Sequence, residues 1–204
     1  MIGRKAVIAL VAAGMLAALL AASGAQAQTA SSTHYSGTTA DGGQWIADVP
    51  TSWNGTLLLY SHGFGPPAAA DAPDANTKQA LLDRGYAMAG SSYDPAGSWW
   101  ALKSALNDQF QTLSAVENLL PSPPTHVFAV GTSMGGLISS LEAEHSNGRL
   151  QAALTTCGIV AGGIQLGNYQ LDGEYAMTQL VNPQHENIKL VNFLPGPAEE
   201  GCLA

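Results

Sequence analysis

The residues most suited to chemistry are a serine and two glycines in the stretch Gly131-Thr132-Ser133-Met134-Gly135. The apolar run Val127 to Val130 before it predicts a buried strand, and the amphipathic segment after it predicts a helix. A serine at such a strand-to-helix turn has a strained backbone, and side chains in place of either glycine would collide with neighbouring elements. The turn lifts the hydroxyl to the N-terminus of a helix. Ser133 is therefore a candidate nucleophile, and an ordinary glycine-rich turn is the alternative.

A second glycine-rich loop follows an earlier apolar strand, in "YSHGFG" at residues 60–65. A tetrahedral oxyanion needs two N–H donors that point at one place. One donor is expected to be the backbone of Met134, just after the nucleophile, and the other that of Phe64 or Gly65. His62 is expected to organise this loop and not to act as the general base.

The segments "SHGFG", "GYAMAGSSYD" and "GTSMGG" together resemble the α/β-hydrolase superfamily. The resemblance is to secreted bacterial serine hydrolases of the esterase, lipase and prolyl-oligopeptidase-like kind. It implies that the serine attacks an ester or amide carbonyl and forms an acyl-enzyme, which water releases. By resemblance, Ser133 is the nucleophile, and Met134 and Phe64 supply the oxyanion donors.

The general base and the acid are harder to place, because in this superfamily both follow the nucleophile in the chain. His145 lies about 18 Å along the helix that begins at the serine, too far to reach it. His185, in "VNPQHENI", is the candidate base, and Asp172 is the candidate acid, with Glu174 beside it. The alternative for Asp172 is that it caps the last helix. The chain is either the N-terminal portion of a longer hydrolase or a product that lacks the catalytic C-terminal half.

Strand-like and helix-like patterns alternate along the chain, which predicts an α/β fold with a mostly parallel sheet flanked by helices. An edge strand is expected near His34-Tyr35. The other predicted strands are residues 44–50, 56–63, 86–94, 126–131 and 150–158, and the predicted helices are 75–85, 104–121, the segment after Ser133, and 171–181. The α/β-hydrolase-like sheet would be truncated after its sixth strand, leaving an edge only partly covered by "IKLVNFL" (188–194). Such an edge predicts self-association.

The N-terminal residues are typical of a secretory signal peptide. Arg4 and Lys5 precede an apolar run from Ala6 to Ala22, and Ala25-Gln26-Ala27 is a small-x-small cleavage site. We expect residues 1–27 to be the signal peptide and residues 28–204 to be one α/β-hydrolase domain, secreted after cleavage and without stable membrane anchoring. The alternative is an uncleaved anchor helix.

Composition excludes several other classes of function. The chain has 204 residues, is 46% hydrophobic and carries a net charge of −8, which argues against nucleic acid as a partner. The five histidines are scattered without ligand spacing, so neither a metal nor another cofactor is expected. Cys157 and Cys202 either pair or stay free.

Three functions are compatible with these features. The first is a secreted serine hydrolase for a small-molecule ester or peptide-like substrate. The second is a catalytically inactive, truncated hydrolase-like or binding protein that lacks the acid and the histidine. The third is an acyltransferase. Trp99 and Trp100 either line an acyl or aromatic pocket or cover the core.

Overall fold

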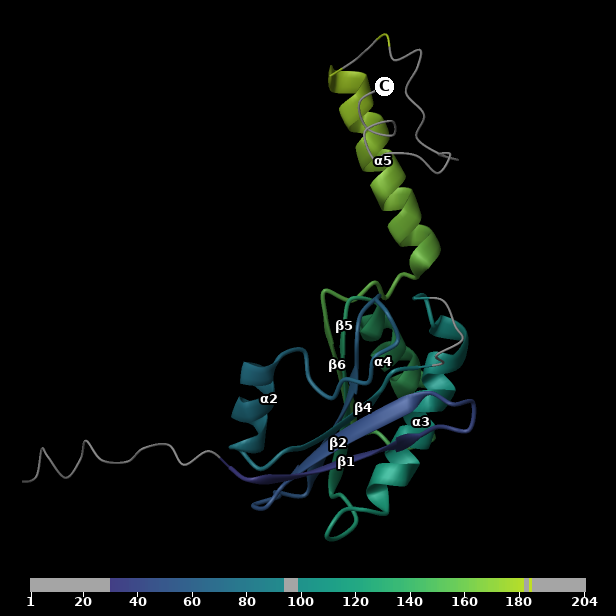
Figure 1. The fold of residues 1–204 in the computed structure, drawn as a ribbon. Coiled ribbons are helices and arrows are strands. Elements are labelled where there is room, and N and C mark those ends of the chain that lie inside the picture. The colour runs from purple at the N-terminus through teal and green to yellow at the C-terminus, as the bar shows by residue number, and fades with distance from the viewer. Residues whose placement is uncertain (1–29, 94–98, 182–183, 185–204) are drawn as a thin grey trace, which may run out of the picture.

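The computed structural model describes residues 30–93, 99–181 and 184, and shows one mixed sheet with helices on both faces (Figure 1). The predicted signal peptide and the predicted base His185 lie outside the described residues. The strands are β1 (Ser32–Thr38), β2 (Gln44–Pro50), β3 (Thr56–Ser61), β4 (Ala87–Ser91), β5 (His126–Thr132) and β6 (Ala152–Thr156). The helices are α2 (Ala75–Leu82), α3 (Leu102–Glu117), α4 (Met134–Glu144) and α5 (Gly163–Val181).

The six strands are arranged in the order β1-β2-β4-β3-β5-β6. The pairs β1–β2 and β2–β4 are antiparallel, whereas β3–β4, β3–β5 and β5–β6 are parallel. The carboxyl ends of the parallel strands therefore lie at the same end of the sheet. Ser61, Ser91 and Thr132 are the last residues of β3, β4 and β5. The predicted α/β class and the mostly parallel sheet flanked by helices are confirmed.

Helix α2 covers one face of the sheet, and α3 and α4 cover the other (Figure 1). The main core lies between the sheet and α3. Its buried members come from β2, β3, β4, β5 and the end of α3 (Trp45, Ala47, Val49, Leu57, Leu59, Ala87, Ala89, Leu113, Val116, Leu120 and Val127). A smaller core lies beneath the start of α4 and contains Tyr93, Ala101, Ala105, Met134 and Ile138.

The buried face of α3 is not apolar throughout. Leu113 and Val116 are buried, but Leu106 and Phe110 are only half-buried. In the middle of the helix three buried side chains are polar, namely Asp108, Gln109 and Thr112. For Gln109 the reason is that it packs on the ends of β3 and β4, where backbone groups need hydrogen-bond partners.

Gln109 supplies several of these partners. Its side-chain amide nitrogen donates to the Tyr60 carbonyl at 2.8 Å and to the Ser61 hydroxyl at 2.6 Å, and its oxygen accepts from the backbone N–H of Ser91 at 3.0 Å. The Ser61 hydroxyl in turn donates to Glu142 of α4 at 2.8 Å. We call Ser61, Gln109 and Glu142, all fully buried, the buried polar network. It joins two strand ends to α3 and α4.

The C-terminal part of the described chain has little packing. Within the described residues β6 pairs only with β5, and all five of its residues are exposed. Helix α5 begins at Gly163, earlier than predicted, projects away from the sheet (Figure 1) and buries none of its residues. The predicted edge of the sheet is present, and self-association through it stays a prediction. Among the described residues no helix is long and apolar enough to cross a membrane.

Burial raises the pKa of Glu142 to about 7, although its hydrogen bonds to Ser61 and Gln109 oppose the shift. The folded protein therefore holds a proton that the unfolded chain releases above about pH 4.5, so stability should fall as pH rises from about 4.5 to 7. We expect Glu142→Gln to flatten this dependence. At pH 8 the free energy of unfolding should rise by about 1–3 kcal/mol in urea titrations.

The matched control is Glu144→Gln, on the exposed side of the same helix. It should leave the difference in unfolding free energy between pH 4.5 and pH 8 within about 0.5 kcal/mol of the original protein. If Glu142→Gln retained the original pH dependence, Glu142 would not be the group that binds the proton.

Candidate active site

Ser133 occupies the turn between β5 and α4 with φ 58° and ψ −120°, a backbone conformation that residues other than glycine rarely adopt. Its backbone N–H donates to the carbonyl of Thr156 at 3.0 Å. Its carbonyl accepts from the N–H of Gly136 at 2.9 Å and from that of Ile159 at 3.3 Å. The end of β6 and the segment after it thus hold the strained turn, and Ser133 itself is only half-buried.

The two flanking glycines are required by close backbone contacts. A Cβ at Gly131 would lie 1.9 Å from the carbonyl oxygen of Gly135. A Cβ at Gly135 would lie 1.8 Å from the carbonyl oxygen of Ser61 at the end of β3. The steric reason that the sequence suggested for this spacing is confirmed.

The loop after β3 lies directly against the serine. A Cβ built on Gly63 would be 3.4 Å from the Cβ of Ser133 and 3.9 Å from its hydroxyl oxygen. Phe64 follows in this loop, and Met134 opens α4 with a fully buried side chain. The two segments that would supply the oxyanion donors are therefore adjacent. The assignment of the Phe64 and Met134 N–H groups to that role stays a prediction.

His62 stabilises the same loop. Its Nδ1 donates to the Gly63 carbonyl at 2.8 Å, and its ring stacks on Tyr93 with a centroid distance of 4.1 Å. The Tyr93 hydroxyl donates to the His62 carbonyl at 3.0 Å. Burial lowers the pKa of His62, which favours the neutral ring. These contacts fit the expected role as a loop organiser.

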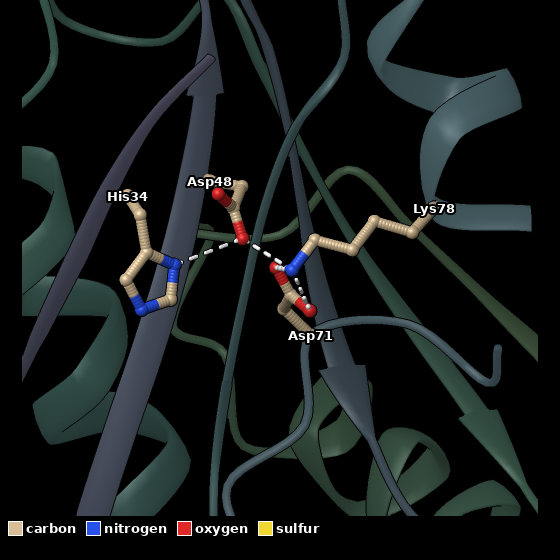
Figure 2. Close-up of polar contacts among 4 residues, drawn as sticks. All are labelled: His34, Asp48, Asp71 and Lys78. Atoms are coloured by element: carbon tan, nitrogen blue, oxygen red, sulfur yellow. Dashed lines mark hydrogen bonds and ion pairs between the residues drawn. The ribbon is translucent and has the colours of Figure 1, made fainter. Parts of the chain in front are cut away.

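The loop that joins β3 to α2 is anchored by a charged cluster at its α2 end (Figure 2). Lys78 of α2 contacts Asp48 of β2 and donates to Asp71 of the loop at 3.0 Å. His34 of β1 lies 3.1 Å from the same Asp48 oxygen. Burial raises the pKa of Asp71 to about 6, and the neighbouring Asp48 adds to the shift. Asp48, a charged residue in the strand "QWIADVP", was the signal for this cluster in the sequence. The cluster was not recognised from the sequence alone.

The remaining candidates are not brought to Ser133. Asp172 lies in the middle of α5 and is exposed, so its interpretation as a helix cap is wrong because α5 begins at Gly163. Glu174 is also exposed on α5. His145 follows the end of α4, where its Nδ1 bonds to the Leu141 carbonyl at 2.9 Å.

Trp99, Trp100 and Cys157 are all exposed in the structure. Trp99 and Trp100 are exposed, so the prediction that they cover the core is wrong. Cys157 is exposed, and Cys202, with which it either pairs or stays unpaired, lies outside the described residues. In the described part of the chain no group of three or more His, Cys, Asp or Glu side chains is placed to hold a metal ion.

Comparison with solved structures identifies the fold. The chain is similar to a Pyrococcus furiosus esterase (TM-score 0.56, 14% identity, 74% of this chain and 57% of that one). It is also similar to a Pyrococcus horikoshii acylaminoacyl peptidase (TM-score 0.52, 14% identity, 65% of this chain and 24% of that one). These proteins are α/β-hydrolases, and the present chain has the α/β-hydrolase fold. It spans about a quarter to three fifths of their length. Searches of family models and of curated proteins find no match.

The contact of Gly135 with Ser61 is testable by Gly135→Ala. The added methyl group would meet backbone that cannot move aside, so we expect a loss of about 2–4 kcal/mol of stability in urea unfolding. Gly173→Ala is the control, because nothing lies within 4 Å of its Cβ position inside α5. Alanine there should be neutral or stabilising by up to about 1 kcal/mol. Equal effects of the two substitutions would contradict the steric argument.

The charged cluster is testable by Lys78→Met. Without the ammonium group, Asp48 and Asp71 face each other in a buried position, so we expect a loss of about 1–3 kcal/mol at pH 8. At pH 4.5 the loss should be smaller, because Asp71 is then protonated and can donate to Asp48. Thermal unfolding at both pH values measures this difference. Lys103→Met, at an exposed position of α3, should change neither value, and an equal loss at both pH values would count against the cluster.

Proposed function

We propose that this protein is a secreted serine hydrolase that cleaves ester or amide bonds through Ser133. One observation carries the proposal: Ser133 has a positive φ at a strand-to-helix turn, and the glycine loop after β3 lies against it. The α/β-hydrolase fold supports it, because in this fold such a serine is exposed at the strand-to-helix turn for attack on a carbonyl.

In the proposed reaction the Ser133 hydroxyl attacks the carbonyl carbon of a small-molecule ester or peptide-like substrate. The N–H groups of Met134 and Phe64 bind the oxyanion, and collapse of the intermediate expels the alcohol or amine and leaves an acyl-enzyme. Water then releases the acid. His185 is the proposed base, and removal of a functioning base slows such chemistry by about 100-fold or more.

A non-catalytic, hydrolase-like binding protein is the second candidate. One observation favours it: within the described residues no histidine bonds to the Ser133 hydroxyl. A serine with only an oxyanion site retains a small part of the catalysis of a complete triad, about 10³–10⁴-fold over water. Ligand binding that survives Ser133→Ala, without turnover by the original protein, would support this second function.

Labelling with a fluorophosphonate probe tests the hydrolase. We expect one covalent adduct on Ser133, detected by intact mass and peptide mapping, which disappears in Ser133→Ala and in urea-unfolded protein. His185→Asn should slow the labelling by about 100-fold or more. His145→Asn is the matched control and should label at the original rate, since His145 lies at the far end of α4 from the serine. Folded protein that does not label at Ser133 would rule out the proposed hydrolase.

A further inference from the structure

Three aromatic side chains from two separate parts of the chain gather near the loop that holds the candidate nucleophile. The Phe64 ring lies 5.4 Å from that of Trp99, edge to face, and 5.2 Å from that of Trp100, in both cases between centroids. We call these three residues the aromatic cluster. Their side chains are 50%, 52% and 41% exposed, respectively.

The cluster is adjacent to the proposed reaction centre because of where Phe64 lies. A Cβ at Gly63 would lie in van der Waals contact with Ser133, and Phe64 is the next residue, about 3.8 Å further along the backbone. Phe64 therefore connects the proposed oxyanion loop to Trp99 and Trp100.

The cluster leaves a contiguous apolar surface exposed. Single exposed apolar residues are ordinary, but contiguous exposed aromatic rings mark binding surfaces. None of the three side chains carries a charge, so the cluster offers ring faces and edges. Aliphatic and aromatic groups of equal size would bury similar area there. An aromatic group gains about 0.5–1.5 kcal/mol more from edge-to-face or offset stacking.

We propose that the aromatic cluster binds an aromatic ring of the substrate, so that the preferred substrates are esters or amides with an aromatic group next to the scissile carbonyl. This inference rests on the proposed function of Ser133. Phe64 then combines two roles, as its backbone faces the oxyanion and its side chain contacts the ring of the same substrate.

Two reactive probes of nearly equal volume test the preference, one with a benzyl and one with a cyclohexylmethyl group on the same fluorophosphonate. We expect the benzyl probe to label Ser133 about 2–10-fold faster, as the stacking energy implies. Trp99→Leu should reduce this ratio toward one, because it removes the stacking partner and slows the benzyl probe more than the cyclohexylmethyl probe. Tyr175→Leu, at an exposed position of α5, should leave both rates unchanged. Labelling without a benzyl preference would overturn the inference while the hydrolase proposal stands.

A non-reactive pair separates the two proposals if Ser133 does not label. Protein containing 5-fluorotryptophan is titrated with phenylacetamide and, separately, with cyclohexylacetamide, and the Trp99 signal is assigned by its loss in Trp99→Leu. We expect phenylacetamide to shift the Trp99 signal at several-fold lower concentration than cyclohexylacetamide. That result without labelling would retain the ring-binding site and remove the hydrolase. Equal shifts, or none, would overturn the ring-binding site.

Discussion

The close approach of Gly135 to the carbonyl of Ser61 is the contact on which the rest of the site depends. It brings the first turn of α4 against the end of β3, where any side chain at position 135 would keep them apart. Because α4 starts immediately after Ser133, the same contact places the serine beside Gly63 in the loop that continues from β3. The strained backbone of Ser133 persists because three main-chain hydrogen bonds and this contact hold it in place.

The chain buries carboxylates on both sides of its sheet and neutralises them in different ways. On the α2 side, Asp48 and Asp71 share the ammonium group of Lys78, and burial together with the neighbouring Asp48 raises the pKa of Asp71 (Figure 2). On the α4 side, Glu142 has a hydroxyl as its hydrogen-bond partner, and burial brings its pKa to about 7. Both arrangements hold chain segments that lead to the loop after β3, which lies beside Ser133. The buried acids therefore help to position the site without contacting it.

Much of the fold followed from local patterns in the sequence. The strand bounds agree closely because strands such as "TLLLYS" are apolar throughout, and Gly131, Ser133 and Gly135 identified the turn because steric exclusion acts over a few residues. The predicted bounds are wrong where contacts within a few residues do not determine where an element begins. Helix α5 starts eight residues before its predicted start because no packed face marks its beginning.

The missed polar contacts have a common physical cause. Gln109, Glu142 and Asp71 look like ordinary surface residues in the sequence, and each is buried only because strand ends and loops distant in the chain converge on it. The aromatic cluster is of the same kind, since nothing near Trp99 in the sequence indicates that Phe64 lies beside it. Residues joined across such distances are visible only once the topology of the sheet is known.

Helix α3 is apolar where it meets the centre of the sheet, at Leu113 and Val116, and polar where it meets the strand ends, at Gln109. Hydrophobic contacts are tolerant of small shifts, whereas hydrogen bonds require defined distances and angles. Gln109 can therefore make its hydrogen bonds only where the ends of β3 and β4 are in register, whereas the apolar contacts of Leu113 and Val116 do not demand that precision. The seating of α3 thus depends on the alignment of the two strands that lead to the loop beside Ser133.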